Sequence, residues 1–304
     1  MKILLIGRLG QVGWELHRAL MCLGEVVVVD RLSQPLALDL TDNDSIVRTV
    51  AAVKPNVIVN AAAYTAVDKA EQADFSALAM QINGTALGVL AEAAKQCQAT
   101  LVHYSTDYVF DGNAQMPYVE TDMTAPNGVY GRSKLIGEQA IIDSGVDYLI
   151  LRTAWVYGAR GQNFLLTMLR LMRERESLGV VADQIGSPTW SRQIALATAL
   201  ILVQCKGSKG FKLDNKKGIY HLTCAGSASW YGFAHEIYQQ ARQLGILQLD
   251  VILNPINTVD YPTPARRPAY SVLSGEKLHK VFNIQLPPWQ LALTCCLAEY
   301  SPPV

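Results

Sequence analysis

The sequence has no excess of positive charge, no run of apolar residues long enough to cross a membrane, and no leader pattern. Lysine plus arginine and aspartate plus glutamate number 26 each, so nothing favours binding along a nucleic-acid phosphate backbone. The longest apolar run, 194–203, is about half of the roughly 20 residues that span a bilayer. The first predicted strand already begins at Lys2, with no signal-peptide pattern before it. We therefore expect a cytosolic protein with neither a nucleic-acid nor a membrane partner.

Metal-binding and disulfide patterns are also missing. None of the six cysteines forms a Cys-x-x-Cys pair or stands at ligand spacing from a histidine. The five histidines include no His-Glu-x-x-His stretch. We interpret the cysteines as buried thiols and predict no metal-dependent hydrolysis.

What the chain does have is enough apolar sequence for a large core, since 50% of its 304 residues are hydrophobic. Its first half alternates short β-branched runs with longer helical patterns, which predicts a parallel sheet covered by helices on both faces. The run Glu25–Asp30 is apolar on both faces, as in a central parallel strand. Strands are predicted at 2–6, 25–30, 56–60, 100–105 and 148–152. Helices are predicted at 12–21, 42–53, 74–96 and 129–142.

The pattern changes after Arg152, where segments shorten and glycine and proline become more frequent. This predicts a dinucleotide-binding domain over 1–152 and a smaller C-terminal substrate-binding lobe over 153–304. A predicted helix at 192–204 and strand at 218–222 indicate that roughly 190–225 rejoins the sheet, which makes the lobe discontinuous. The predicted fold is therefore α/β, a doubly wound, Rossmann-like parallel sheet with a smaller lobe.

Three glycines, Gly7, Gly10 and Gly13, directly follow the first strand and open the first helix. Without side chains there, backbone amides can approach a pyrophosphate at a helix N-terminus. Asp30 ends the second strand, where a carboxylate can bind the adenosine ribose of NADH. Arg31 could instead pair with the 2′-phosphate of NADPH. The motif predicts a dinucleotide site and leaves the choice between NADPH and NADH open, and an ordinary tight turn is the alternative.

Tyr130 and Lys134 lie four residues apart in a predicted helix and so leave the same face. A nearby ammonium lowers the pKa of a phenol, which predicts that Tyr130 protonates a carbonyl oxygen as hydride reaches its carbon. Lys134 would also hold the ribose hydroxyls of the nicotinamide half. Ser105 or Thr106, at the end of the fourth strand, could hydrogen-bond the same oxygen. A simple strand-end turn is the alternative for that pair.

These motifs resemble the extended short-chain dehydrogenase/reductases, and five longer stretches resemble the dTDP-4-dehydrorhamnose reductase family within them. Two of the five are distinctive, Thr65–Glu71 and Pro262–Pro268, whereas the glycine and tyrosine motifs mark only the superfamily. The five stretches are Asn60–Glu71, His103–Phe110, Arg152–Tyr157, Asp183–Thr189 and Tyr261–Pro268.

The resemblance implies reduction of the C4 ketone of a dTDP-sugar, the last step of an activated-sugar pathway that feeds cell-surface polysaccharide. It implies Tyr130 as proton donor, assisted by Thr106 and Lys134. The cofactor contacts that it implies are Gly10, Gln11, Val12, Asp30, Asp39, Leu40, Ala63, Tyr64, Thr65 and Tyr104. For the sugar it implies Thr106, Asp107 and Trp155, whose indole could cover the ring. Arg266 and Arg267, held between prolines, could face the diphosphate.

The sequence departs from the family at one site. Some members form dimers around a metal held by glutamates, but this chain combines Glu15 with Arg192 and Gln290. An arginine does not bind a hard cation, so we predict no metal here and leave open whether the chain is a homodimer. Two alternatives to the reductase remain: a sugar-nucleotide epimerase or dehydratase, for which Asp107 beside Thr106 leaves room, and a non-catalytic regulatory subunit with the same fold.

Overall fold

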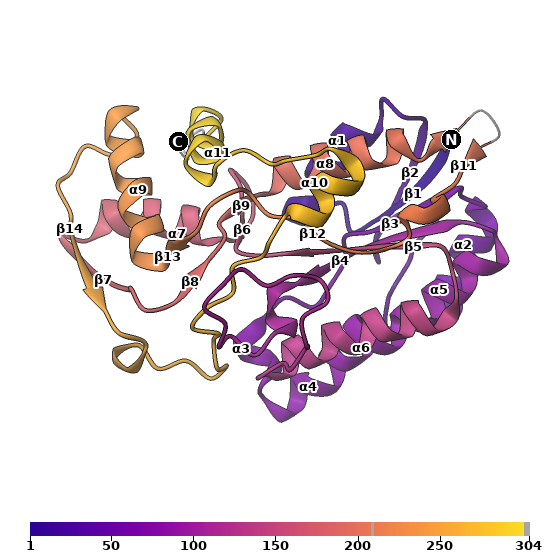
Figure 1. The fold of residues 1–304 in the computed structure, drawn as a ribbon, viewed down its shortest axis with the longest axis horizontal. Helices are drawn as coiled ribbons and strands as arrows, with labels where there is room; N and C mark the ends of the chain where they lie inside the picture. The colour runs from indigo at the N-terminus through magenta and orange to yellow at the C-terminus, as the bar shows by residue number, and fades with distance from the viewer. Residues whose placement is uncertain (208–209, 301–304) are drawn as a thin grey trace.

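The computed structural model describes residues 1–207 and 210–300, and its centre is a six-stranded, entirely parallel sheet (Figure 1). The strand order is β2-β1-β3-β4-β5-β12, so the chain reverses direction across the sheet between β1 and β3. In open α/β sheets, ligands bind beyond the carboxyl ends of the strands at such a reversal. The strands are β1 (Lys2–Ile6), β2 (Glu25–Val29), β3 (Val57–Asn60), β4 (Thr100–Thr106), β5 (Tyr148–Thr153) and β12 (Gly218–His221).

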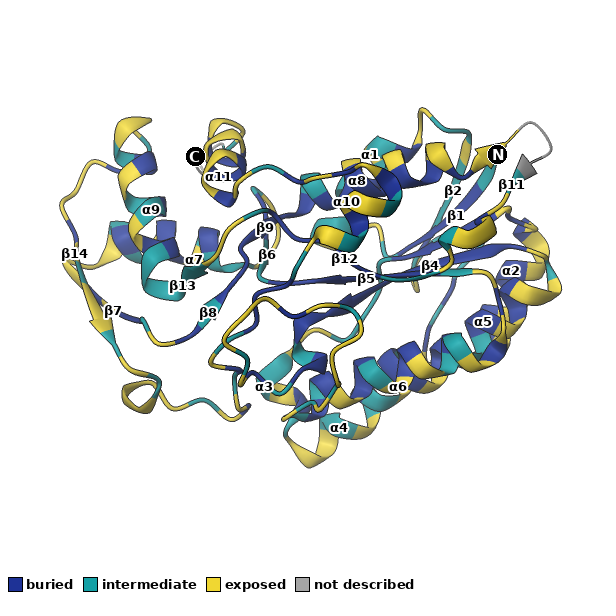
Figure 2. Ribbon diagram, viewed as in Figure 1, coloured by how far each residue is buried: buried dark blue, intermediate teal, exposed yellow. Residues whose placement is uncertain are grey.

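Both faces of the sheet are buried, because alternate strand residues are apolar on both sides. Ile3 and Leu5 pack against α1 (Gln11–Leu20) and α8 (Ser191–Gln204). On the other face, Leu4 and Ile6 share a core cluster with α2 (Asn43–Val53), α5 (Ala86–Gln96) and α6 (Val129–Ser144). In Figure 2 the inner strands β3, β4 and β5 are accordingly dark blue, the edge strand β2 is partly buried, and the outer sides of the helices are exposed.

The predicted α/β fold class is confirmed, and the predicted element boundaries agree with the observed ones to within two residues, except at 74–96. There the single predicted helix is divided into α4 (Ala73–Met80), the π-helical turn η1 (Gln81–Thr85) and α5. The extra residue of a π-turn leaves the apolar periodicity on both sides intact, so the sequence pattern does not reveal it.

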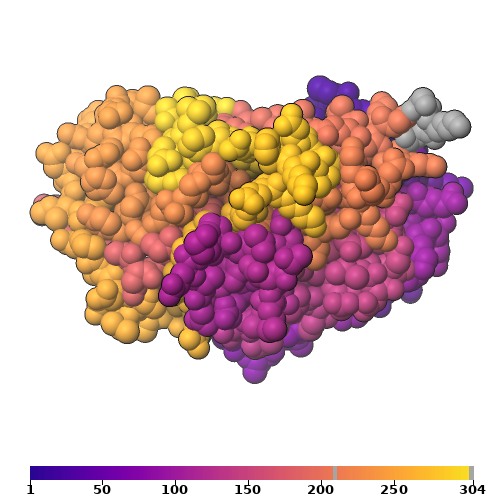
Figure 3. All heavy atoms as spheres, in the orientation of Figure 1, coloured from indigo at the N-terminus to yellow at the C-terminus, as the bar shows by residue number. Residues whose placement is uncertain are grey.

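The segments after β5 build a second group of elements beside the sheet (Figure 1). In Figure 3 the C-terminal segment, in yellow, lies between the orange segments of this group and the magenta segments of the first half. Two parts of 190–225 return to the elements of the first half: α8 packs on α1, and β12 joins the sheet beside β5. No helix in the described ranges combines the length and apolarity needed to span a membrane.

The longer elements of this second group are α7 (Phe164–Glu174), α9 (Trp230–Gln243), α10 (Glu276–Phe282), α11 (Trp289–Ala298) and the parallel pair β7 (Ser177–Val181) and β14 (Ile252–Ile256). Short strands and turns connect them: β6 (Val156–Tyr157), β8 (Ile185–Gly186), β9 (Thr189–Trp190), β10 (Lys206–Gly207), β11 (Gly210–Phe211), η3 (Asp214–Lys216), β13 (Ala228–Ser229) and η4 (Thr258–Asp260). In the first half, α3 (Val67–Ala70) follows β3 and η2 (Asp107–Val109) follows β4.

A buried ion pair attaches α6 to the sheet. Arg152 on β5 donates from Nε and Nη2 to the two carboxylate oxygens of Glu138, at 2.9 and 2.6 Å. Both side chains are at most 3% exposed, so neither charge has water to replace its partner. The pair therefore fixes the position of the helix that carries Tyr130 and Lys134.

Glu138→Gln should lower the free energy of unfolding by about 3 kcal/mol, because it leaves the Arg152 charge buried without a counter-charge. Urea denaturation followed by circular dichroism measures this. The matched control is Glu174→Gln, which breaks the exposed pair of Glu174 with Arg170 and should cost about 0.5 kcal/mol or less. Equal losses in the two variants would contradict the prediction.

Candidate active site

The glycine loop lies at the reversal point of the sheet, pressed against the segment that follows β3. Gly7 has φ +88°, and a Cβ on it would lie 2.7 Å from the backbone nitrogen of Ala62. A Cβ on Gly13 would lie 2.1 Å from the Gly7 carbonyl oxygen. Gly10 precedes α1 without a side-chain cap. Only glycine fits such a loop, and its unblocked amides suit a pyrophosphate.

Gln11 and Val12 follow Gly10 as the first two residues of α1, and both contact other parts of the protein. The Gln11 side chain donates to the Gln162 carbonyl (3.3 Å) and accepts from Asn163 Nδ2 (2.9 Å), so it ties the loop to the start of α7. Val12 packs against the core.

At the end of β2, the Asp30 carboxylate lies beside Arg8. One Asp30 oxygen accepts from the Leu32 amide (2.8 Å), and the other lies 3.7 Å from Arg8 Nε. Arg8 and Arg31 are exposed. Arg8 was not singled out in the sequence, although its position inside the glycine motif could have indicated it. A carboxylate next to a guanidinium group can serve a ribose hydroxyl or a 2′-phosphate.

Two further predicted cofactor residues follow β2 at a distance. Asp39 accepts from both the amide and the hydroxyl of Thr41, each at 2.8 Å. Leu40 is buried in the cluster beneath α2. The Asp39 carboxylate is thus engaged in a local turn.

Ala63, Tyr64 and Thr65 follow β3, and a buried asparagine holds their backbone. Asn83 accepts from the Tyr64 amide (2.9 Å) and donates to the Tyr64 carbonyl (3.0 Å) and to Ser133 Oγ (3.0 Å). Asn83 lies in η1, and its position in an apparently regular helix gave no sequence signal.

Tyr130 and Lys134 leave α6 toward β4. The Tyr130 ring meets the edge of Tyr108, with centroids 5.7 Å apart. Lys134 is 2% exposed and donates from Nζ to the Tyr104 carbonyl at 2.6 Å, with His103 Nε2 at 3.0 Å. Burial lowers the pKa of Lys134 to about 8, although the Glu138 charge opposes this.

The structure differs from the expectation that the lysine lowers the pKa of the tyrosine. Burial raises the pKa of Tyr130, and a hydrogen bond with Thr106 acts in the opposite direction. Lys134 does not contribute to the pKa shift of Tyr130. Its amino group is instead hydrogen-bonded to the Tyr104 carbonyl of β4. The two side chains share a helix face, but in this state they do not act on each other.

The end of β4 supplies three further polar residues. Thr106 Oγ1 donates to Asp107 Oδ1 (3.0 Å) and accepts from the Tyr108 amide (3.2 Å). Burial raises the pKa of Asp107 to about 6, against several hydrogen bonds that lower it. Ser105 Oγ is buried without a hydrogen-bond partner among the described residues. Tyr104 points to the opposite face, where its hydroxyl meets Thr198 Oγ1 at 2.7 Å.

Of the three predicted sugar and diphosphate residues outside β4 and η2, the structure brings Trp155 and Arg267 to this region and leaves Arg266 exposed. Trp155, just after β5, stacks on Trp230 at 3.5 Å with the rings nearly parallel. Arg267 donates to Asp68 (2.8 Å) and to the Tyr108 hydroxyl (3.1 Å), so it lies one ring away from Tyr130. Arg266 points away and is exposed.

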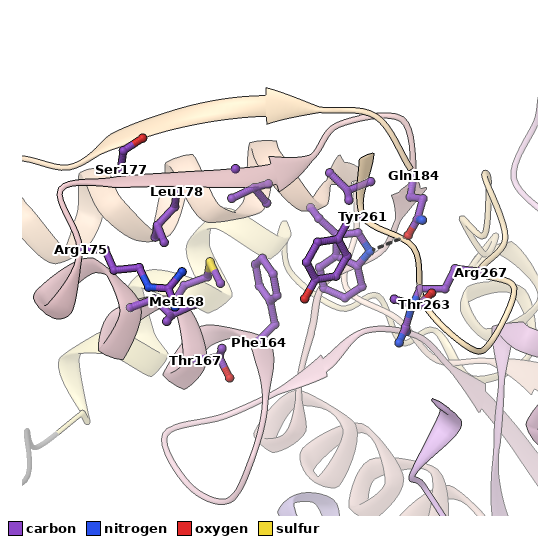
Figure 4. A pocket seen from close by; sticks show the side chains of 15 residues that line it. Phe164, Thr167, Met168, Arg175, Ser177, Leu178, Gln184, Tyr261, Thr263 and Arg267 are labelled. Atoms are coloured by element: carbon purple, nitrogen blue, oxygen red, sulfur yellow. Dashed lines mark hydrogen bonds between the residues drawn. The ribbon is translucent and has the colours of Figure 1, made fainter. Parts of the chain in front are cut away.

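A cavity of about 530 Å³ opens beside Arg267, between α7, β7 and the loop 258–267 (Figure 4). Phe164, Trp230 and Tyr261 give it aromatic walls, and Arg175 and Arg267 contribute positive charge. Trp230 donates to Gln184 Oε1 at 3.2 Å, the dashed line in Figure 4. The sequence singled out only Arg267 here, although Gln184, Tyr261 and Thr263 lie in two of the stretches that resemble the family. The walls from α7 and α9 come from segments without a motif.

The residues at the glutamate site do not fit a divalent cation. Arg192 donates to Glu15 (3.1 Å from Nε) and also pairs with Glu299, so a guanidinium already neutralises both carboxylates. Gln290 is exposed and offers no charge. No group of three or more His, Cys, Asp or Glu side chains with metal-binding geometry occurs in the described part of the chain.

Adding Mg²⁺ or EDTA should therefore leave the Tm unchanged in a thermal-shift assay. The informative comparison is Arg192→Glu, which places a third carboxylate beside Glu15 and Glu299. This variant should gain a Mg²⁺-dependent rise in Tm, since a ligand that binds only the native state stabilises it. A large metal-dependent stabilisation of the unaltered protein would count against the prediction.

Comparison with known proteins identifies the family. Residues 1–301 match the family model described as RmlD substrate binding domain. A dTDP-4-dehydrorhamnose reductase of Burkholderia thailandensis is 50% identical over 98% of this chain and 99% of its own. Solved reductases from Clostridium acetobutylicum (37% identity, TM-score 0.86) and Bacillus anthracis, in complex with NADP (34%, TM-score 0.84), each match over 98% of this chain and 99% of theirs. The chain belongs to the dTDP-4-dehydrorhamnose reductase family.

Proposed function

We propose that the protein reduces the C4 ketone of dTDP-4-dehydro-L-rhamnose to dTDP-L-rhamnose, with hydride from NADPH or NADH, in the cytoplasm. The observation that carries the proposal is that the Tyr130 ring packs against Tyr108, two residues after Thr106, at the carboxyl end of β4. A proton donor and a second hydroxyl there can share one carbonyl oxygen between them. The family membership supplies the identity of the sugar.

The loop Gly7–Gly13, with Asp30, Arg8 and the backbone of Tyr64, would hold the dinucleotide. The fit rests on the absent side chains of Gly7 and Gly13, where a Cβ would strike the backbone. When bound, the nicotinamide supplies the hydride that reduces the ketone.

The protein's own residues complete the reduction. Tyr130 gives its phenolic proton to the oxygen as the carbon gains hydride, and the product is an alcohol. Thr106 orients that oxygen. The Thr106 hydroxyl is itself held in place by hydrogen bonds with Asp107 and the Tyr108 amide. Lys134, in its ammonium form, assists by stabilising the phenolate that Tyr130 leaves.

For the substrate, we propose that the lobe 153–304 binds the nucleotide end. The aromatic cavity beside α7 suits a pyrimidine base, and Arg267 at its inner side suits the diphosphate. Trp155, stacked on Trp230, would cover the sugar between that cavity and Tyr130. Arg267 is preferred to Arg266 for this role because only Arg267 lines the cavity.

Tyr130→Phe should lower kcat/KM by about 10²- to 10⁴-fold, the usual contribution of general acid catalysis. Turnover is followed as NAD(P)H oxidation with dTDP-4-dehydrorhamnose, and cofactor affinity, measured by fluorescence, should not change. Tyr148→Phe, at the start of β5, is the control and should keep full activity. One cofactor oxidised per sugar reduced is expected. Turnover without net oxidation would instead indicate an epimerase or dehydratase.

Arg267→Met should raise the KM for the dTDP-sugar about 10- to 100-fold, since it removes charge-assisted hydrogen bonds to the diphosphate. The cofactor Kd should stay the same. Arg266→Met is the neighbouring control and should change neither constant. Equal effects of the two substitutions would exclude a specific role for Arg267.

A further inference from the structure

A line of buried polar groups runs behind Lys134 across two strands. His103 on β4 lies directly opposite Asn60 on β3 in the sheet register. Asn60 Nδ2 is 3.2 Å from His103 Nδ1, and His103 Nε2 is 3.0 Å from Lys134 Nζ. All three side chains are at most 2% exposed, so their hydrogen bonds form without water.

The backbone amide of Ala62, which contacts Asn60, determines which atoms donate and which accept in these hydrogen bonds. The Ala62 backbone N–H, which can only donate, donates to Asn60 Oδ1 at 3.1 Å. The other end of the amide, Nδ2, therefore faces His103, and His103 Nδ1 must accept. Turning the amide over would bring two donors together at Ala62, so this orientation is the satisfied one.

The protonation of His103 is thereby set. Burial is the largest cause that holds the pKa of His103 well below its ordinary value, so the ring is neutral. A neutral imidazole that accepts at Nδ1 carries its proton at Nε2. That N–H points at Lys134 Nζ.

An ammonium group has three donors and no acceptor, so it cannot receive this N–H. A neutral amine can, while it still donates to the Tyr104 carbonyl. We propose that Asn60 and His103 are positioning residues that favour the neutral amine of Lys134 over its ammonium form in the cofactor-free enzyme. Forming the ammonium then requires the imidazole proton to move from Nε2 to Nδ1, which the Asn60 amide opposes.

Other charged and titratable groups around Lys134 do not reverse its preference for the neutral amine. On its own helix, Glu138 favours the ammonium, but Arg152 of β5 neutralises Glu138. Tyr130, one turn earlier on α6, is neutral because burial raises its pKa. From β4, the hydrogen-bond partners of Lys134 among the described residues are His103 and the Tyr104 carbonyl.

The consequence for turnover rests on the proposed reduction, in which the ammonium assists Tyr130. kcat/KM should then fall as the pH rises through the pKa of Lys134, which burial lowers to about 8, far below that of an ordinary lysine. The enzyme would lose activity in mildly alkaline solution because His103 favours the amine.

The direct test is nitrogen NMR of the ¹⁵N-labelled, cofactor-free protein at a pH above about 8, where Lys134 is the amine. His103 should show a protonated Nε2 and an unprotonated Nδ1. The opposite tautomer, or a doubly protonated ring, would overturn the proposal. This measurement requires no variant and no turnover. An inactive protein with the expected tautomer would refute the proposed function alone, and an active one with the opposite tautomer would refute this inference alone.

The second test is the pKa of Lys134 from the ¹³Cε shift of labelled lysine, assigned with Lys134→Arg. His103→Phe removes the donor and should raise this pKa, and with it the alkaline limb of kcat/KM, by about one pH unit. If His103 instead accepted a hydrogen bond from the ammonium, the same substitution would lower the pKa, and the proposal would fail. His221→Phe, at an equally buried histidine on β12, is the control and should leave Lys134 unchanged.

Discussion

The site depends on the way α6 is fastened to the sheet. A parallel sheet buried on both faces admits a polar side chain only where another element supplies a partner. On the face beneath α6, the polar residues His103 and Arg152 occupy adjacent strands, and the helix meets them with Lys134 and Glu138. These contacts set the rotation of α6 and so direct Tyr130 toward the carboxyl end of β4.

Buried polar groups that need hydrogen-bond partners also hold the backbone beside the proposed cofactor site. Where the strand order reverses, the chain leaves β1 so close to the segment after β3 that Gly7 and Ala62 nearly touch. Asn60 satisfies the Ala62 amide in that segment, and Asn83 satisfies Tyr64. The backbone that borders the dinucleotide site is therefore held by buried amides, one of which also faces His103.

On the substrate side, one arginine joins the two halves of the molecule. Arg267, which enters from the C-terminal segment, meets Asp68 and Tyr108 of the first half and lines the cavity beside α7. Because Tyr108 packs against Tyr130, the cavity and the proposed proton donor are separated by a single ring. Arg192 also joins two elements, because its guanidinium pairs with Glu15 of α1 and with Glu299 at the end of α11.

The sequence by itself determined the fold class, most element boundaries and the glycine loop. These depend on local periodicity and on residues a few positions apart, which are visible along the chain. The spacing of Tyr130 and Lys134 likewise predicted a shared helix face. The direction in which Lys134 points, however, was decided by the Tyr104 carbonyl and by His103 on another element.

Only the tertiary structure decided the remaining contacts. The pairing of Asn60 with His103 requires the register of β3 against β4, and the ion pair of Glu15 with Arg192 joins residues far apart in the chain. The π-turn at Asn83 and the cavity walls from α7 and α9 carry no motif. Burial then shifted the pKa values of Tyr130 and Lys134, because desolvation depends on what surrounds a group in space and not on its neighbours in sequence.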